Sequence, residues 1–300
     1  MAGFEAYPAM TMVGSRVESI PADHFNHCVA VVRLSDGTLL PLDPTWVPFS
    51  RELWSSLEQQ QNYLPGTPEG SDLCKTPISP AERHYIRITA SNTLQDNGTL
   101  KGTLTVKAEG QSDRALRGVF TGGFQTEWET YMEKQILAVS PRAKVTRAVY
   151  SKDPRNYMRA PMEMSFSYEI PGYAMTGDGV RILKPFVMNG LFSRVMSFLS
   201  IDTDLEKREH GFADRCSRLV ELDETLLLPS GYHMEGEPLK DEISGSAAAF
   251  NGSLTQQGNA VRLKSTLELK KRVYEAADWN NFREAVSAYK KYGDDLIIGK

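Results

Sequence analysis

The sequence is poor in cysteine and has no long apolar run, and both features bear on its class. Its three cysteines, Cys28, Cys74 and Cys216, lie far apart and form no CxxC pair. Neither a disulfide framework nor a structural zinc site is therefore indicated. No stretch approaches the ~20 apolar residues of a membrane-spanning helix, and the first residues lack the pattern of an export signal. We expect no membrane partner.

Strong charge of either sign is also missing. The net charge is -4 over 300 residues, and no basic run is interleaved with aromatic residues. Such a chain has no general electrostatic reason to bind nucleic acid. The hydrophobic content of 41% is sufficient to bury a sizeable core in one large domain or two ordinary ones.

A β-hairpin is the clearest local signal in the first 80 residues. The apolar run at residues 29–34 is followed by Ser-Asp-Gly-Thr and by a second run at residues 39–42, which is typical of two antiparallel strands around a tight turn. The prolines and glycines of residues 44–80 predict irregular structure with a short helix at residues 51–60. We place a domain boundary near Pro80, which gives domains 1–80 and 81–300.

The second domain is predicted to be rich in β-strands with two accessory helices. Residues 85–89 and 100–106 alternate between apolar and polar side chains, the period of a half-buried strand. Apolar residues recur at three- and four-residue intervals in two segments, which predicts amphipathic helices at 125–139 and 276–289. Further strands are expected at 144–150, 162–170, 180–186, 218–228 and 261–271. The predicted class is α+β.

A histidine and an aspartate stand at opposite ends of the predicted hairpin. His27 begins the first strand and Asp43 follows the second, so folding at the turn brings them close. A carboxylate beside an imidazole can hold one tautomer and stabilise the protonated form. This is the supporting half of a nucleophile-His-Asp site. The alternative interpretation is structural, because an aspartate before proline is often no more than a turn former.

The segment FNHCVAVVRLSDGTLLPLDPTW, residues 25–46, resembles the His and Asp motifs of the transglutaminase-like superfamily. That family has a papain-like fold with a catalytic Cys on a helix, followed by a His and an Asp on successive strands. The resemblance implies that His27 is the general base and Asp43 its orienting partner. Residues 2–8 are similar to the strand that follows the Cys helix, so the Cys is expected upstream of Gly3, outside this chain.

None of the three cysteines is a good substitute for that nucleophile. Cys28 follows His27 on the same strand, so its side chain should point to the opposite face, and we expect it to be a small buried residue. Cys74 lies in an irregular segment where nothing predicts a lowered thiol pKa. Cys216 belongs to the β-rich domain.

No metal or other cofactor is expected from the remaining candidates. His24 could pair with His27, but the sequence shows no third ligand, and His24 is interpreted as a loop residue. Three isolated histidines are interpreted as structural: His84, His210 and His233. Three aromatic residues either line a cleft beside His27 or pack in the core, and we favour the core: Trp46, Trp54 and Tyr63.

The last hundred residues carry a second resemblance. The segment LLLPSGY at residues 226–232 and the strands and helix around it are similar, over about residues 205–300, to the β-sandwich domains of unknown function that flank the transglutaminase-like core in secreted bacterial proteins. The resemblance supplies no catalytic residue. It implies a truncated transglutaminase-like hairpin region followed by a sandwich-like domain, in a parent exported to the periplasm or cell surface.

Two functions are consistent with the sequence. In the first, the chain is part of an enzyme for acyl transfer or peptide hydrolysis that acts on a peptide or protein substrate, with its nucleophile elsewhere, so that the isolated chain is inactive. In the second, it is a non-catalytic binding or scaffolding module in which His27 and Asp43 are inherited remnants.

Overall fold

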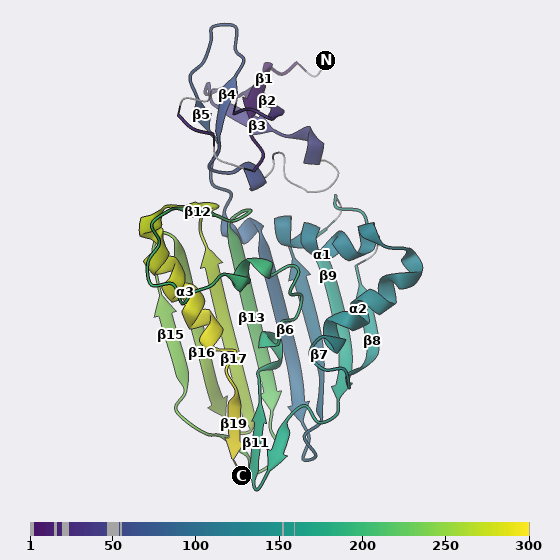
Figure 1. The fold of residues 1–300 in the computed structure, drawn as a ribbon. Helices are drawn as coiled ribbons and strands as arrows, with labels where there is room; N and C mark the ends of the chain where they lie inside the picture. The colour runs from purple at the N-terminus through teal and green to yellow at the C-terminus, as the bar shows by residue number, and fades with distance from the viewer. Residues whose placement is uncertain are drawn as a thin grey trace.

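The computed structural model contains two main sheets at opposite ends of the molecule, with helices packed on the larger one (Figure 1). This mixed architecture confirms the α+β class. No helix among the described residues is long and apolar enough to cross a membrane. The structure describes residues 3–14, 17–19, 24–46, 54, 56–151, 153–158 and 160–299.

The smaller sheet lies in the first 80 residues and has the strand order β3-β2-β1-β4-β5. Its hairpin confirms the prediction, because β2 and β3 pair antiparallel with Ala30 opposite Leu42. Gly37 adopts a φ of +85° in the turn, a backbone conformation that favours glycine. The strands are β1 (Ala6–Thr11), β2 (His27–Arg33), β3 (Leu39–Leu42), β4 (Asn62–Pro65) and β5 (Cys74–Lys75).

Two short 3-10 helices follow the hairpin, η1 (Pro44–Trp46) and η2 (Ser56–Glu58). The helix expected at 51–60 falls partly outside the described residues, and its described part contains only η2. The apolar side of the sheet has a small core made of Ala9, Val29, Val31 and Tyr63.

The larger sheet has eight strands in the order β15-β16-β17-β13-β6-β7-β9-β8. Strands β6 and β13 run parallel at its centre, although they are far apart in sequence, and the other neighbours are antiparallel. The strands are β6 (Tyr85–Leu94), β7 (Leu100–Ala108), β8 (Lys144–Tyr150), β9 (Met162–Ile170), β13 (Arg218–Leu227), β15 (Leu239–Ile243), β16 (Ala248–Gln257) and β17 (Ala260–Leu269).

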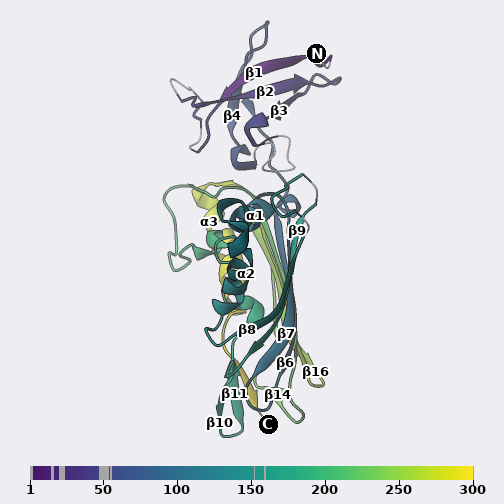
Figure 2. The same ribbon diagram turned by 90° about the vertical axis from the view of Figure 1, so that its right-hand side faces the viewer.

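The described residues contain three α-helices, and these lie on the same face of this sheet (Figure 2). Both predicted helices are confirmed as α2 and α3, each preceded by a 3-10 turn, whereas α1 was not predicted. Helices and loops thus supply most of the second layer that a sandwich-like domain requires. The elements are α1 (Gly110–Gly122), η4 (Gln125–Glu127), α2 (Trp128–Leu137), η7 (Ala276–Asp278) and α3 (Trp279–Lys291).

Shorter elements complete the fold. The strand predicted at 180–186 ends earlier, at Leu183, and the chain turns at Pro185 into a 3-10 helix. A small sheet has the order β10-β11-β19-β14, and a second consists of β12 and β18. These elements are η3 (Ala81–Arg83), β10 (Met175–Gly177), β11 (Val180–Leu183), η5 (Phe186–Met188), η6 (Ser197–Ser200), β12 (Phe212–Ala213), β14 (His233–Met234), β18 (Val273–Tyr274) and β19 (Leu296–Gly299).

Alternation along the strands explains the core. In β6 the even-numbered residues from Ile86 to Leu94 are buried under the helices, and the odd-numbered ones face out. Helix α3 contributes one face of aromatic and aliphatic side chains to the same core, including Trp279, Phe282 and Val286.

The two parts of the chain are joined by the amide side chains of Gln59, which is buried, and Gln60, which is partly buried. Gln60 Oε1 accepts hydrogen bonds from the backbone N–H groups of Arg272 (2.7 Å) and Val273 (3.1 Å), and its Nε2 donates to the Val273 carbonyl. Gln59 Nε2 donates to Ser217 Oγ at 3.5 Å. The domain boundary near Pro80 remains a prediction, but these bonds show that the two parts make specific polar contacts.

Candidate functional site

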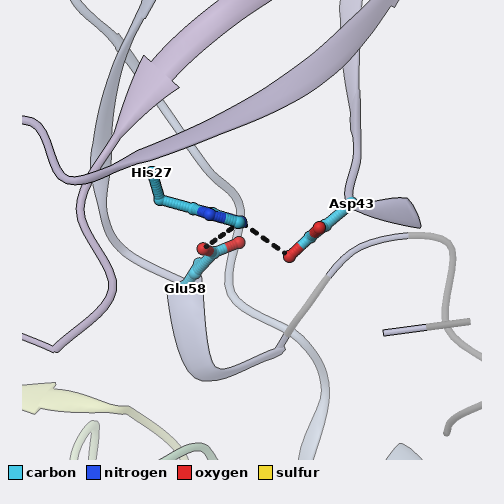
Figure 3. A group of neighbouring side chains, drawn as sticks. All are labelled: His27, Asp43 and Glu58. Atoms are coloured by element: carbon cyan, nitrogen blue, oxygen red, sulfur yellow. Dashed lines mark hydrogen bonds and ion pairs between the residues drawn. The ribbon is translucent and has the colours of Figure 1, made fainter. Parts of the chain in front are cut away.

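His27 and Asp43 meet at one end of the small sheet (Figure 3). His27 Nε2 lies 3.2 Å from Asp43 Oδ2, within hydrogen-bonding reach. The register of the hairpin explains the contact, because Asp43 directly follows Leu42, the last paired residue of β3, and His27 begins β2 three residues before Ala30, the partner of Leu42. The expectation that the two side chains face each other is therefore confirmed, whereas their catalytic role remains a prediction.

Asp43 is held in place by the turn that follows it. Its Oδ1 accepts hydrogen bonds from the backbone N–H of Thr45 at 3.0 Å and from Thr45 Oγ1 at 2.7 Å. The residue is only 1% exposed. Asp43 Oδ1 thus forms the turn that the structural interpretation predicted, and Oδ2 remains available to the His27 imidazole.

Glu58 is a third member of the site that the sequence analysis missed. Its Oε1 lies 3.6 Å from His27 Nε2, and its side chain is 4% exposed. Burial raises the pKa of Glu58 to about 8, the Asp43 carboxylate adds to the rise, and the Arg272 guanidinium opposes it. Glu58 is thus largely protonated at neutral pH, so its contact with His27 is not a full ion pair.

Nothing in the sequence identified Glu58, because it begins the polar run Glu58-Gln59-Gln60-Gln61, which is typical of a solvated loop. In the structure, Glu58, Gln59 and Gln61 are buried. The amides are satisfied by hydrogen bonds across the junction and within the small sheet. Glu58 Oε1, by contrast, has no hydrogen-bond partner in the part of the chain that the structure describes.

The two carboxyl groups occupy only one side of the imidazole. Both approach Nε2, and among the described residues no hydrogen bond to Nδ1 of His27 is found. The side chain is 19% exposed. With Asp43 accepting from Nε2–H, Nδ1 would carry the lone pair of a neutral imidazole and could accept a proton from a further group.

The three cysteines, all of which are described, make no hydrogen bond to His27. Cys28 points away from it, as expected, but the expectation that Cys28 is buried was wrong: it is exposed. It pairs with Met10 on the face of the small sheet opposite the core, where Met10 is also exposed. Cys216 is buried near the junction.

Cys74 pairs with Tyr63 across β4 and β5. Burial, with a smaller effect from Cys74, raises the pKa of Tyr63 to about 12. Tyr63 and Trp54 also line a cavity of about 10 Å³ together with Asp43 and Glu58. A cavity of this size holds roughly one water molecule or ion rather than a peptide. Tyr63 belongs to the small core, as favoured, and the Trp46 side chain lies outside the described residues.

His84 has the structural role predicted for it. Its Nδ1 accepts from the Gln111 backbone N–H at 3.3 Å, and its Nε2 lies 2.6 Å from Ser79 Oγ. Burial lowers the pKa of His84 to about 3, so it stays neutral. His233 is different, because it is exposed and its Nε2 lies 3.2 Å from Glu235 Oε1.

Comparisons with known proteins support the predictions for the second part of the chain more than those for the first. A family model described as a domain of unknown function with a solved structure, DUF3858, matches residues 180–298. This confirms a domain of unknown function in the region expected to contain one. No curated protein matches the chain.

One solved structure to which the chain is similar is a putative protease from Parabacteroides distasonis, at 12% identity and a TM-score of 0.46. The match covers 100% of this chain and 41% of that structure, so the chain spans less than half of its length. This likeness is too weak to support an argument about activity.

Proposed function

We propose that this chain contributes the histidine and aspartate of a Cys-His-Asp site in a transglutaminase-like protein that catalyses acyl transfer or peptide hydrolysis. The observation that carries the proposal is the 3.2 Å contact between His27 Nε2 and a buried, turn-held Asp43. The resemblance of residues 25–46 to the family motifs supports it. The nucleophile would come from a segment upstream of Gly3 in a longer parent.

In this mechanism a thiol would approach Nδ1 of His27, the ring nitrogen that faces away from both carboxyl groups. His27 would take the thiol proton, and the thiolate would attack a peptide or glutamine amide carbonyl to form a thioester. The imidazolium would then donate its proton to the leaving amine. Asp43 would stabilise the imidazolium through Nε2–H without itself accepting the proton.

Kinetics of the parent protein would test this proposal. We expect Asp43→Asn to lower kcat by a factor on the order of 10² to 10⁴, because an amide no longer fixes the tautomer. We expect His27→Ala to lower it at least as much. Cys28→Ser is the matched control, since it changes the neighbouring residue on the opposite face of β2 and should leave kcat unchanged.

The second candidate is the non-catalytic binding module. The turn that Asp43 makes with Thr45 favours it, because an aspartate with a purely structural role would be held in the same way. Peptide or protein binding that persists in both His27→Ala and Asp43→Asn, in a parent without turnover, would support this function. Loss of turnover in those variants with binding retained would support the enzyme.

A further inference from the structure

We propose that His27, Asp43 and Glu58 form a binding site for one divalent cation of the zinc class. The proposal goes beyond the acyl-transfer function and does not rest on it. The ligands would be His27 Nε2, one oxygen of Asp43 and one of Glu58, all of which lie within 4.8 Å of one another. Among the described residues, this is the group of histidine, cysteine and carboxylate side chains that meets this criterion.

The distances match those between ligands of a tetrahedral metal ion. Zinc bonds of about 2.0 to 2.2 Å at tetrahedral angles separate neighbouring ligand atoms by about 3.3 to 3.6 Å. His27 Nε2 lies 3.2 Å from Asp43 Oδ2 and 3.6 Å from Glu58 Oε1. A cation could therefore reach these atoms with only small side-chain adjustments.

Glu58 provides an independent sign of a missing ligand. Its side chain is 4% exposed, yet Oε1 has no hydrogen-bond partner among the described residues, and the carboxyl group points towards His27 (Figure 3). A buried carboxyl oxygen without a partner costs free energy that a bound cation would recover. The neighbouring glutamine amides are satisfied, whereas Arg272 Nε, near Glu58, also lacks a hydrogen-bond partner among the described residues.

The surroundings also suit a metal ion. Thr45 binds the second oxygen of Asp43, as outer groups commonly do for metal-bound carboxylates. His27 is partly exposed, which leaves a route to a fourth ligand from solvent.

The ligand set selects the class of cation. One imidazole and two carboxyl groups suit zinc and related transition metals, whereas calcium requires six to eight oxygen ligands and magnesium keeps an octahedral shell. Arg272 lies near Glu58. Its guanidinium donates to the carbonyls of Gly14 and Gln59, so it does not occupy the position of the cation.

The site predicts inhibition if the proposed function is also correct. A cation on Nε2 and Oδ2 would replace the hydrogen bond that orients His27 as a base. Metal binding and turnover would then be mutually exclusive, but binding can be measured without any activity. Failure of one proposal is thus distinguishable from failure of the other.

The test is titration of the purified, metal-free chain with Zn²⁺ by calorimetry and with Co²⁺ by visible absorption. We expect one cation per chain and the intense d–d bands of a tetrahedral site, without a sulfur-to-cobalt charge-transfer band. Glu58→Gln and His27→Ala should each weaken binding by about 10-fold or more. Circular dichroism would confirm that both variants are folded, and His27→Ala changes a partly exposed side chain.

His233→Ala is the matched control, because His233 and Glu235 form a surface pair at the same 3.2 Å separation but with only two ligands. The His233→Ala chain should bind Zn²⁺ as tightly as the unsubstituted chain. No stoichiometric binding would overturn the proposal. Binding that survives both Glu58→Gln and His27→Ala would also overturn it. The same holds for binding that disappears in Cys28→Ser or His233→Ala, because the cation would then occupy an adventitious surface site.

Discussion

Glu224 offers a sharp test of how burial governs this fold. It lies on β13 with its side chain in the core beneath the helices, where Oε1 accepts from Asn92 Nδ2 at 2.8 Å and Oε2 from the Val187 backbone N–H at 3.0 Å. Burial raises its pKa to about 7, while these hydrogen bonds oppose the rise. The perturbation is Glu224→Gln, which keeps the shape and removes the titration.

The pKa values of Glu224 in the folded and unfolded states decide how stability changes with pH. The folded state holds the proton more tightly than the unfolded chain, whose ordinary value is 4.5. The stabilising effect of this proton is complete below about pH 4.5 and is lost as the pH rises to about 7. Since each pKa unit corresponds to ~1.4 kcal/mol, the contribution of Glu224 to the free energy of unfolding should fall by about 3 kcal/mol between about pH 4.5 and pH 8.

Glu224→Gln should remove this pH dependence without removing the hydrogen bonds. Asn92 Oδ1 accepts from Tyr168 O–H at 2.6 Å. If the Asn92 amide turns over, its oxygen can accept from the new glutamine, and its nitrogen can donate to the tyrosine oxygen. The free energy of unfolding of Glu224→Gln should therefore equal that of the unsubstituted chain at about pH 5 and exceed it by about 3 kcal/mol near pH 9.

Urea unfolding followed by circular dichroism at about pH 5, 7 and 9, in the presence of a chelator, would measure this. The control is Glu221→Gln, which lies on the same strand but faces outwards, where Glu221 pairs with Arg87. A surface pair of this kind contributes about 0 to 1 kcal/mol. If the unsubstituted chain and Glu224→Gln lost the same free energy of unfolding between about pH 5 and 9, the reasoning would be refuted.

Three further predictions concern the core, the activity and the division of the chain. Arg117→Met should destabilise the protein by about 3 to 5 kcal/mol in urea unfolding, because it leaves Asp113 charged and buried without its cation; an effect below about 1 kcal/mol would show that the pair is not buried as described. The isolated chain should show no transglutaminase or protease turnover, since it lacks a thiolate at His27; turnover that is abolished by Cys74→Ala would identify a nucleophile we rejected. Residues 82–300 should unfold cooperatively in a thermal scan, whereas 1–80 alone should be less stable; a stable 1–80 beside an unfolded 82–300 would contradict this division.

Much of the secondary structure could be predicted because the signals are local. Strands β8 and β9 begin and end at the predicted residues. In β9 the side chains alternate between core and less buried positions along the whole segment, whereas in β8 the alternation is interrupted by a register shift between Val145 and Arg147. The hairpin at His27 was also readable, because a turn between two apolar runs fixes which residues meet. That contact depends on only 17 consecutive residues, from His27 to Asp43.

The sequence analysis missed helix α1 because the buried face of this helix is only partly apolar. Asp113, Leu116, Arg117 and Phe120 recur at helical spacing and are all buried. Two of them are charged and neutralise each other, with Arg117 Nε 2.9 Å from Asp113 Oδ2. A pattern search that counts apolar residues cannot recognise such a stripe, because its burial depends on the pairing.

The sequence by itself determined several of the longer strands, such as β6, β9 and β13, but not β15 or β16. It also determined two of the three α-helices of the described residues and the meeting of His27 with Asp43, because each depends on neighbours along the chain. Tertiary structure alone decided the parallel pairing of β6 with β13 and the position of Glu58. Glu58 is the first residue of a polar run that would be solvated in isolation. Only the packing of the small sheet against distant residues such as Arg272 removes it from water and brings it to the imidazole.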